Sequence, residues 1–213
     1  MDSYVTEDQQ VEAIKIWWKE NGVSVFVGAA LGLLLVFAVR TWNDRQAVKS
    51  EAAAQIYQQI EMGLKKNQAI AVQQAEARLM EEYPSSVYTT LGALAEAAVL
   101  VGNGDSAGAR GRLEWTILQA SDPHLKALAQ LRLGRLILDE GNFARALTLG
   151  EAAATIGFQA EANELRGDAL RIQGNYEDAR SAYQAALVKL SPNSAMATNL
   201  RLKLDDLGQS PHG

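Results

Sequence analysis

Paired carboxylates come nearest, in type and spacing, to residues that could perform catalysis in this chain. Glu81 is followed by Glu82 and Asp205 by Asp206, and two neighbouring acids can act as a general acid and a general base. Both pairs fall at predicted helix ends, where charged side chains are usually solvated. His124, one of 2 histidines, follows Pro123 at a predicted helix start, where it fits a surface or cap residue better than a base. The sequence therefore predicts no catalytic residue.

Cofactor and metal chemistry is as poorly represented as catalysis. The chain contains no Cys, which removes thiolate zinc sites, iron–sulfur clusters and disulfides, and 2 His are too few for a histidine-based metal site. The Gly-rich pieces at 102–104 and 108–111 match neither GxGxxG nor GxxxxGK[ST], the patterns that cradle phosphate. A net charge of −5 gives no basic footprint for nucleic acid. We expect no cofactor, metal, nucleic acid or small-molecule substrate.

A membrane segment is the strongest local signal. Residues 21–39, between Glu20 and Arg40, contain no charge, and as a helix at about 1.5 Å per residue they would cover about 28 Å, close to the hydrocarbon thickness of a bilayer. Tryptophans flank this segment at positions typical of the headgroup layers: Trp17, Trp18 and Trp42. We predict a transmembrane helix at 21–39, preceded by a short acidic N-terminus at 1–20.

Two other interpretations of this apolar segment fit less well. A buried helix of a soluble core would have one polar face, whereas residues 21–39 are apolar on every side. A cleaved signal peptide would have a basic start and a small-residue cleavage site, whereas the preceding region is acidic and Phe37-Ala38-Val39-Arg40 is a poor site. An uncleaved membrane anchor is therefore the favoured interpretation.

Within the anchor, Ser24, Gly28 and Gly32 recur every four residues, which places them on one face of a helix. Such a stripe allows a second membrane helix to approach closely, although Gly is also common in membrane helices generally. The charges that would set the orientation are almost balanced: Lys15 and Lys19 before the segment, and Arg40, Arg45 and Lys49 after it. The residues alone leave the orientation open.

The rest of the chain is predicted to be helical and repetitive. Gly-, Pro-, Asn- and Ser-rich breaks divide it into about nine helices, and Gly141-Asn142-Phe143 recurs 33 residues later as Gly174-Asn175-Tyr176. Three further pairs share this offset: Gly134 with Gly167, Ala146 with Ala179, and Ala153 with Ala186. An unrelated bundle with Ala-rich seams would not explain so many coincidences at one offset, which is that of the tetratricopeptide (TPR) repeat.

We therefore predict an all-α chain in which a single N-terminal transmembrane helix is followed by a TPR-like α-solenoid of helix hairpins at 43–208. A final helix at about 193–207, with Lys203 among its charged residues, is predicted to cap the stack toward solvent. A disordered tail is predicted at 209–213.

A stack of TPR hairpins has a concave face, lined mainly by the first helix of each pair. The side chains predicted to line this groove are Leu128, Leu131, Arg135 and Leu138 in one repeat, Glu161, Glu164, Asp168 and Arg171 in the next, and Arg201 in the cap. The Lys, Asn and Arg set with which some TPR domains grip a C-terminal carboxylate is absent. A mixed apolar and acidic groove suits extended or partly folded polypeptide or the flank of another protein; the alternative is that these are ordinary solvated positions.

The order of these parts resembles a known family. The resemblance is carried by an acidic start, a Trp-Trp stretch before the anchor, Arg-Thr-Trp after it, and two blocks in the best repeat: residues 8–13, 17–22, 40–42, 165–170 and 174–180. Together they resemble the ancillary subunit of the bacterial Sec translocon, also called the YfgM-like family, over essentially the whole length.

The resemblance implies an inner-membrane protein with a cytoplasmic N-terminus and a periplasmic body. It also implies association with the SecYEG channel and with a membrane-anchored periplasmic chaperone of the prolyl-isomerase class. The expected function is that of a non-enzymatic adaptor in the lipid bilayer that passes newly exported, nascent polypeptides to the chaperone. The alternatives are a structural scaffold for envelope assembly or division, or a TPR protein that binds a regulator, without a role in secretion.

Overall fold

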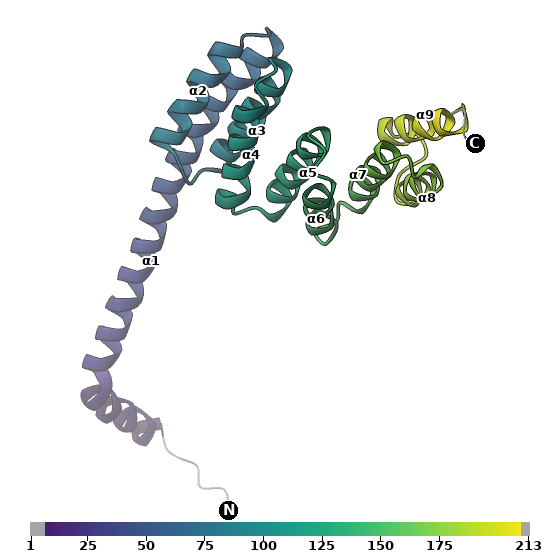
Figure 1. The fold of residues 1–213 in the computed structure, drawn as a ribbon. Helices are drawn as coiled ribbons and strands as arrows, with labels where there is room; N and C mark the ends of the chain where they lie inside the picture. Colours follow the sequence, from purple (N-terminus) through teal and green to yellow (C-terminus); the bar gives the residue numbers. More distant parts are fainter. Residues whose placement is uncertain (1–6, 210–213) are drawn as a thin grey trace, which may run out of the picture. The chain divides into compact units, whose positions relative to one another are not determined.

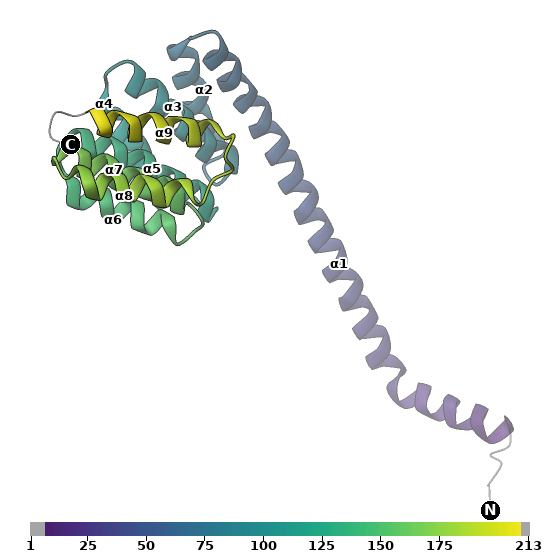
Figure 2. The ribbon, with the colours of Figure 1, turned by 90° about the vertical axis from the view of Figure 1, so that its right-hand side faces the viewer.

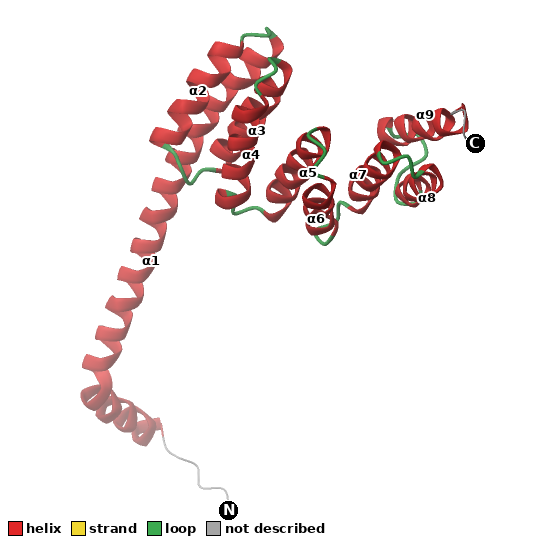
Figure 3. Cartoon of the chain, in the orientation of Figure 1, coloured by secondary structure: helices red, strands yellow, loops and turns green. Residues whose placement is uncertain are grey.

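The computed structural model describes residues 7–209, and every regular element in that range is an α-helix (Figure 3). The chain divides into two compact units, Met1–Glu51 and Ala52–Gly213. Helix α1, Glu7–Lys65, contributes to both units (Figure 1). The prediction of an all-helical chain is confirmed for the described residues.

The first unit consists of the greater part of α1. An 18-residue window of this helix has a mean hydropathy of 2.5 and is only 6% buried, and it is the one described helix long and apolar enough to cross a membrane. A helix that exposes so much apolar surface does not serve as the core of a soluble domain. The ribbon bends near its N-terminal end (Figure 2). Residues 7–20 of the predicted N-terminal segment are helical, and residues 1–6 lie outside the described part.

The second unit is a succession of antiparallel hairpins. The last turns of α1 precede α2, after which α3 pairs with α4, α5 with α6, and α7 with α8, and α9 follows α8. First helices of successive pairs also touch, α3 with α5 and α5 with α7. The bounds are α2 Ala69–Glu82, α3 Val87–Gly102, α4 Ser106–Gln119, α5 Pro123–Asp139, α6 Phe143–Ala154, α7 Gln159–Ile172, α8 Tyr176–Leu187 and α9 Ala195–Gln209.

The turns inside the three central hairpins share one geometry. Gly104, Gly141 and Gly174 have φ of +79°, +81° and +81°, a left-handed conformation that glycine adopts without steric cost. In each turn the next residue's N–H donates back to the carbonyl five residues earlier, which satisfies an orphan carbonyl of the preceding helix: Asp105 to Leu100 at 2.9 Å, Asn142 to Ile137 at 3.2 Å, and Asn175 to Leu170 at 2.9 Å. The repeat predicted at 141 and 174 therefore has a third member at 104.

Small residues allow the paired helices to approach closely. Ala146, Ala153, Ala179 and Ala186 are fully buried. A Cβ on Gly134 would lie 2.8 Å from Leu165 Cδ2, because helices α5 and α7 meet there through the Leu165 side chain. The buried residues form three clusters in succession along the chain, as expected when each pair buries its apolar surface only against its neighbours.

The boundaries of this unit differ slightly from those predicted. The compact unit begins at Ala52 rather than at residue 43, because residues 43–51 of α1 are exposed and add nothing to the core. At the other end α9 extends to Gln209, the first residue of the predicted tail, and residues 210–213 lie outside the described part.

Candidate protein-binding face

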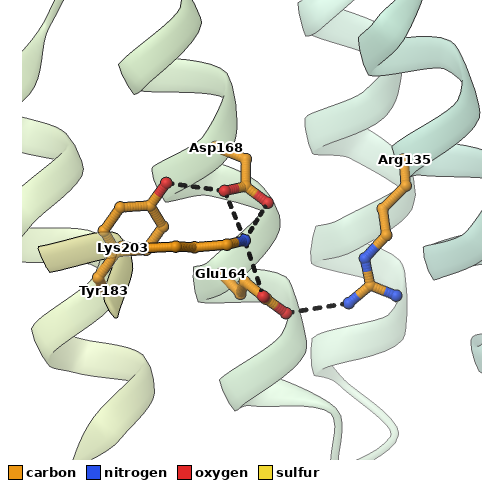
Figure 4. Close-up of polar contacts among 5 residues, drawn as sticks. All are labelled: Arg135, Glu164, Asp168, Tyr183 and Lys203. Carbon is orange, nitrogen blue, oxygen red and sulfur yellow. Dashed lines mark hydrogen bonds and ion pairs between the residues drawn. The ribbon is translucent and has the colours of Figure 1, made fainter. Parts of the chain in front are cut away.

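A polar network on the first helices begins with two carboxylates of α7. Glu164 and Asp168 lie one turn apart, so both project from the same side of the helix toward Lys203 of α9 (Figure 4). The Lys203 Nζ atom lies 2.8 Å from Glu164 Oε1 and 2.7 and 2.8 Å from the two oxygens of Asp168. The Glu164 and Asp168 side chains are only 13% and 17% exposed. Lys203 therefore contacts both carboxylates and fastens α9 to α7.

Tyr183 of α8 joins the network through Asp168 (Figure 4). Its hydroxyl donates to Asp168 Oδ1 at 2.7 Å, and the residue is fully buried. Its ring occupies the space beside Gly167, where a Cβ would overlap it. Burial, followed by the hydrogen bond and charge of Asp168, raises the pKa of Tyr183, so the hydroxyl stays protonated and acts as a donor. Lys203 Nζ also lies 5.6 Å from the ring centroid, within the range of a cation–π contact.

Arg135 extends the network to α5. Its Nη2 atom lies 3.1 Å from Glu164 Oε2, and its side chain remains 42% exposed. We call Arg135, Glu164, Asp168, Tyr183 and Lys203 the inner network. It joins α5, α7, α8 and α9, and it balances two acids with two bases.

Arg132 lies three residues before Arg135 on α5, so the two arginines share a face of the helix. Arg132 Nη1 donates to the Leu94 carbonyl of α3 at 2.9 Å, and within residues 7–209 no carboxylate pairs with it. Burial, followed by the charge of Arg135, lowers the pKa of Arg132, whereas Tyr57 raises it. Tyr57 of α1 in turn contacts Tyr88 of α3, with ring centroids 5.8 Å apart. These residues extend the same face toward α3 and α1.

A second polar cluster lies inside the α2–α4 region. We call Glu76, Glu96 and Arg112 the core triad. Arg112 Nε lies 2.6 Å from Glu96 Oε2, whereas neither oxygen of Glu76 has a hydrogen-bond partner among the described residues. Glu76 is fully buried, and its carboxylate occupies the space where a Cβ of Gly92 would stand.

Glu76 carries the largest perturbation of a carboxyl in the described chain. Burial, followed by the charge of Glu96, raises the pKa of Glu76 to about 8, against a smaller opposing effect of Arg112. Burial also raises the pKa of Glu96, although Arg112 opposes this. A shifted carboxyl can mark an active site, but a side chain with no solvent exposure cannot meet a substrate. The core triad is therefore a structural feature.

The remaining chemistry of the described residues is sparse. No group of three or more His, Cys, Asp or Glu in the range 7–209 is placed to hold a metal ion. Of the adjacent acids, Glu82 forms an exposed pair with Arg78 of its own helix at 3.4 Å, and Asp205 and Asp206 are exposed. His124 lies against Phe158, with ring centroids 6.2 Å apart.

The predicted packing stripe lies on the exposed surface of α1. Ser24, Gly28 and Gly32 are all exposed, and a Cβ added to either glycine would meet nothing within 4 Å. The backbone is thus accessible along one face of the apolar segment. Packing of another helix there stays a prediction.

Comparison with known proteins identifies the architecture as a whole. The family model described as a tetratricopeptide repeat-like domain matches residues 15–209, which include both the apolar segment and the hairpins. The ancillary SecYEG translocon subunit of Escherichia coli is 30% identical over 207 residues, covering 97% of this chain and 99% of that protein. The chain belongs to this family.

Two further relatives carry the same name. The ancillary SecYEG translocon subunit of Neisseria gonorrhoeae is 26% identical over 208 residues, covering 97% of this chain and 100% of the relative. That of Haemophilus influenzae is 24% identical over 182 residues, covering 85% and 89%. The family resemblance and the TPR-like fold predicted from the sequence are confirmed.

The structure places the predicted groove residues in different environments. Arg135, Glu164 and Asp168 are brought together in the inner network. Leu128 and Glu161 are half-buried, and Arg171 and Arg201 are exposed.

Two groove residues were wrongly assigned. Leu131 and Leu138 are only 1% and 4% exposed and belong to the central hydrophobic cluster. Helix α5 is surrounded by α3, α4, α6 and α7. More of its surface is therefore buried than in a helix that packs on one side only. Apolar residues at helical spacing on α5 therefore face the core.

The prediction for Lys203 was also wrong. It was predicted to face solvent on the capping helix, but its side chain is 32% exposed and contacts two carboxylates of α7. Tyr183, Arg132 and the core triad were not predicted as polar sites. The position 33 residues before Tyr183 is Gly150, so the repeat gave no signal for the Tyr183 ring beside Gly167.

Proposed function

We propose that this chain is a non-enzymatic, single-pass adaptor of the bacterial inner membrane that associates with the SecYEG translocon. The observation that carries the proposal is the end-to-end match with the Escherichia coli ancillary SecYEG translocon subunit, which covers 97% of this chain and 99% of that protein. Such a match includes the apolar helix and the hairpin stack together, so it supports a shared role of the complete architecture rather than of one repeat.

The body would bind other polypeptides. Stacked helix hairpins use their extended inner surface for this purpose, and the inner network and Arg132 place charged groups on the first helices of this stack. We propose that the N-terminus lies in the cytoplasm and the body in the periplasm, where it would pass newly exported chains to a membrane-anchored chaperone of the prolyl-isomerase class. An absence of Cys is compatible with that oxidising compartment.

The membrane helix would dock beside the channel through its small-residue face. Ser24, Gly28 and Gly32 leave the backbone of α1 accessible along this face, and close backbone approach favours helix association in lipid. Leucine at Gly28 and Gly32 would fill this face while keeping the segment apolar. Leucine at Ala30, an exposed position two residues from both Gly28 and Gly32 and so away from their face, provides the matched control.

Photo-crosslinking in intact cells tests the proposal. A photoreactive residue in place of Leu128, which is half-buried on α5, samples the inner face, and one in place of Leu118, which is 79% exposed on α4, is the control. We expect crosslinks from the inner position to SecYEG, the chaperone or exported chains. Crosslinks only to cell-wall or division proteins would instead support the scaffold alternative.

Protease protection tests the orientation separately. Protease added outside spheroplasts with intact inner membranes should degrade the body from residue 43 onward if that body is periplasmic. Protection of the body until detergent is added would reverse the proposed orientation. In that case the alternative of a cytoplasmic regulator-binding protein would be favoured.

A further inference from the structure

We propose that the Arg132 and Arg135 side of the stack binds an acidic segment of a partner polypeptide, with a partner carboxylate held between the two guanidinium groups. This inference rests on the proposed function, because it names the chemistry of a polypeptide that the adaptor would recognise. The surface is formed by α1, α3 and α5, and it adjoins the inner network at Arg135.

Arg132 carries a charge that no carboxylate of the described residues pairs with. Arg132 is half-buried, yet its one hydrogen bond among the described residues is to the neutral Leu94 carbonyl at 2.9 Å. A guanidinium group has five N–H donors, so most of its donors remain available. Its neighbour on the same face is a second cation, Arg135, whose charge lowers the pKa of Arg132. A carboxylate placed between them would relieve this repulsion and could bind in the bidentate manner that arginine favours.

The carboxylates of the inner network are already bound by cations of the chain. Glu164 and Asp168 are bound by Lys203, and Glu164 also contacts Arg135 at 3.1 Å. The charge of Glu61 on α1 raises the pKa of Tyr57, whereas Glu61 is not among the groups that change the pKa of Arg132. Glu161 lies in the first turn of α7, where the helix dipole stabilises a negative charge. The carboxylates of Glu164 and Asp168 are therefore already bound and less available to a basic partner. Arg132, in contrast, has N–H donors that can bind an acidic partner.

Aromatic and apolar side chains lie beside Arg132. Tyr57 and Tyr88 form a ring pair with centroids 5.8 Å apart, and Leu128 lies one turn before Arg132 on α5. All three are half-buried. Tyrosines offer large apolar contact surface with a polar tip and are enriched where proteins bind one another. The preferred segment would thus combine a carboxylate with an apolar side chain.

A peptide titration tests this inference on the full-length chain in lipid nanodiscs. The probes are two fluorescent, unstructured peptides of identical length, one with Leu and two Glu in a Gly/Ser background and one with both Glu replaced by Gln. We expect the Glu peptide to bind at least about tenfold more tightly, a difference of about 1.4 kcal/mol. High salt should weaken this preference because the contact is electrostatic.

Variants then assign the effect to Arg132. Arg132→Gln should lower the affinity for the Glu peptide about tenfold, and Arg132→Lys should retain part of it. Arg166→Gln is the matched control, because Arg166 is exposed on α7 and lies two residues from both Glu164 and Asp168, away from their face. Circular dichroism and thermal unfolding establish that each variant is folded.

The outcomes separate the inference from the proposed function. Equal binding of the two peptides, binding of neither, or equal losses in Arg132→Gln and Arg166→Gln would each overturn the inference. Co-isolation of the chain with SecYEG is measured in parallel. If co-isolation persists while the peptides show no preference, only the inference fails; if the wild-type chain does not co-isolate with SecYEG, the proposed function fails whatever the peptides show.

Discussion

The core triad and the inner network solve the same electrostatic problem in opposite ways. Each gathers two carboxylates between packed helices, but the triad in α2–α4 supplies one base, Arg112, and the network in α5–α9 supplies two bases and a tyrosine hydroxyl. The network therefore has one base for each of its acids. In the triad, Glu76 has no hydrogen-bond partner among the described residues and is fully buried, so it retains its proton at neutral pH.

The comparison indicates that the number of neighbouring cations decides whether a charged carboxylate is tolerated between packed helices. Burying a charged carboxylate without a partner costs several kcal/mol, so such a group takes up a proton instead. The same residue type thus stabilises the fold in the network and makes it sensitive to pH in the triad. Substitutions that remove a charged group from one cluster should therefore make its contribution to stability resemble that of the other cluster.

Loss of Arg112 should have the largest effect. Arg112→Met would leave Glu96 and Glu76 without a cation, and removal of one partner of a buried ion pair typically costs about 3–5 kcal/mol. Because the Arg112 side chain is 31% exposed, we expect a loss near the lower end, about 3 kcal/mol, in the free energy of unfolding measured with urea in detergent. Arg78→Met removes the exposed pair with Glu82 and should cost less than about 0.5 kcal/mol.

A double substitution sharpens this prediction. Glu96→Gln combined with Arg112→Met removes both charges of the pair, and it should recover a large part of the lost stability. A double variant no more stable than Arg112→Met would show that Arg112 acts through packing against Met80, whose Sδ lies 2.8 Å from its Nη1, rather than through charge.

Glu76→Gln should have the next largest effect, with the opposite sign. The pKa of Glu76 is about 8 in the folded chain, against 4.5 as its ordinary value. The folded state therefore holds a proton that the unfolded state releases, so Glu76 lowers the free energy of unfolding progressively as pH rises from about 4.5 to about 8. Gln imitates the protonated acid, and at pH 7 we expect a gain of about 2–3 kcal/mol.

The pH profile is the decisive measurement for Glu76. Urea unfolding of wild type and Glu76→Gln should give similar stabilities below about pH 4.5 and should diverge as pH approaches 8. A constant difference at all pH values would mean that Glu76 is ionised in the folded chain. Glu61→Gln, at an exposed site on α1, is the matched control for the loss of a carboxylate.

Sequence reasoning succeeded where the chain repeats and failed where it does not. Gly141 and Gly174 occur in identical turns, and their equivalence followed directly from the 33-residue offset. Helix α9 has no repeat partner, so its register against α7, and with it the contacts of Lys203, could not be deduced. The core triad lies before residue 134, where the 33-residue offset named above begins.

The failure at Leu131 and Leu138 has a different cause. Periodicity shows which residues share a helix face, but it does not show whether that face meets a neighbouring helix or a groove. Four helices surround α5, and only their positions reveal that these leucines are buried. Glu164 and Asp168 share a face of α7, as their spacing indicates, whereas their contact with Lys203 could not be deduced from the sequence.

Replacing Lys203 tests whether the inner network can be made to resemble the triad. Lys203→Met leaves Glu164 and Asp168 with Arg135 as their one base among the contacts described here. Since both acids are largely shielded, we expect a loss of about 2 kcal/mol and faster hydrogen exchange in α9, which Lys203 fastens to α7. Arg201→Met, at an exposed site of the same helix, is the control. Equal losses in the two variants would contradict a special role of Lys203.

Tyr183→Phe should have the smallest effect of the series and isolates one hydrogen bond. The substitution keeps the ring that fills the space beside Gly167 but removes the hydroxyl that donates to Asp168 at 2.7 Å. Because Lys203 still contacts both oxygens of Asp168, this carboxylate is not left without a partner. The loss should therefore be about 1.5 kcal/mol, the lower end of the range for one hydrogen bond to a charged group. A loss as large as that of Lys203→Met would show that the hydroxyl, and not the ammonium, is what makes two carboxylates tolerable at this seam.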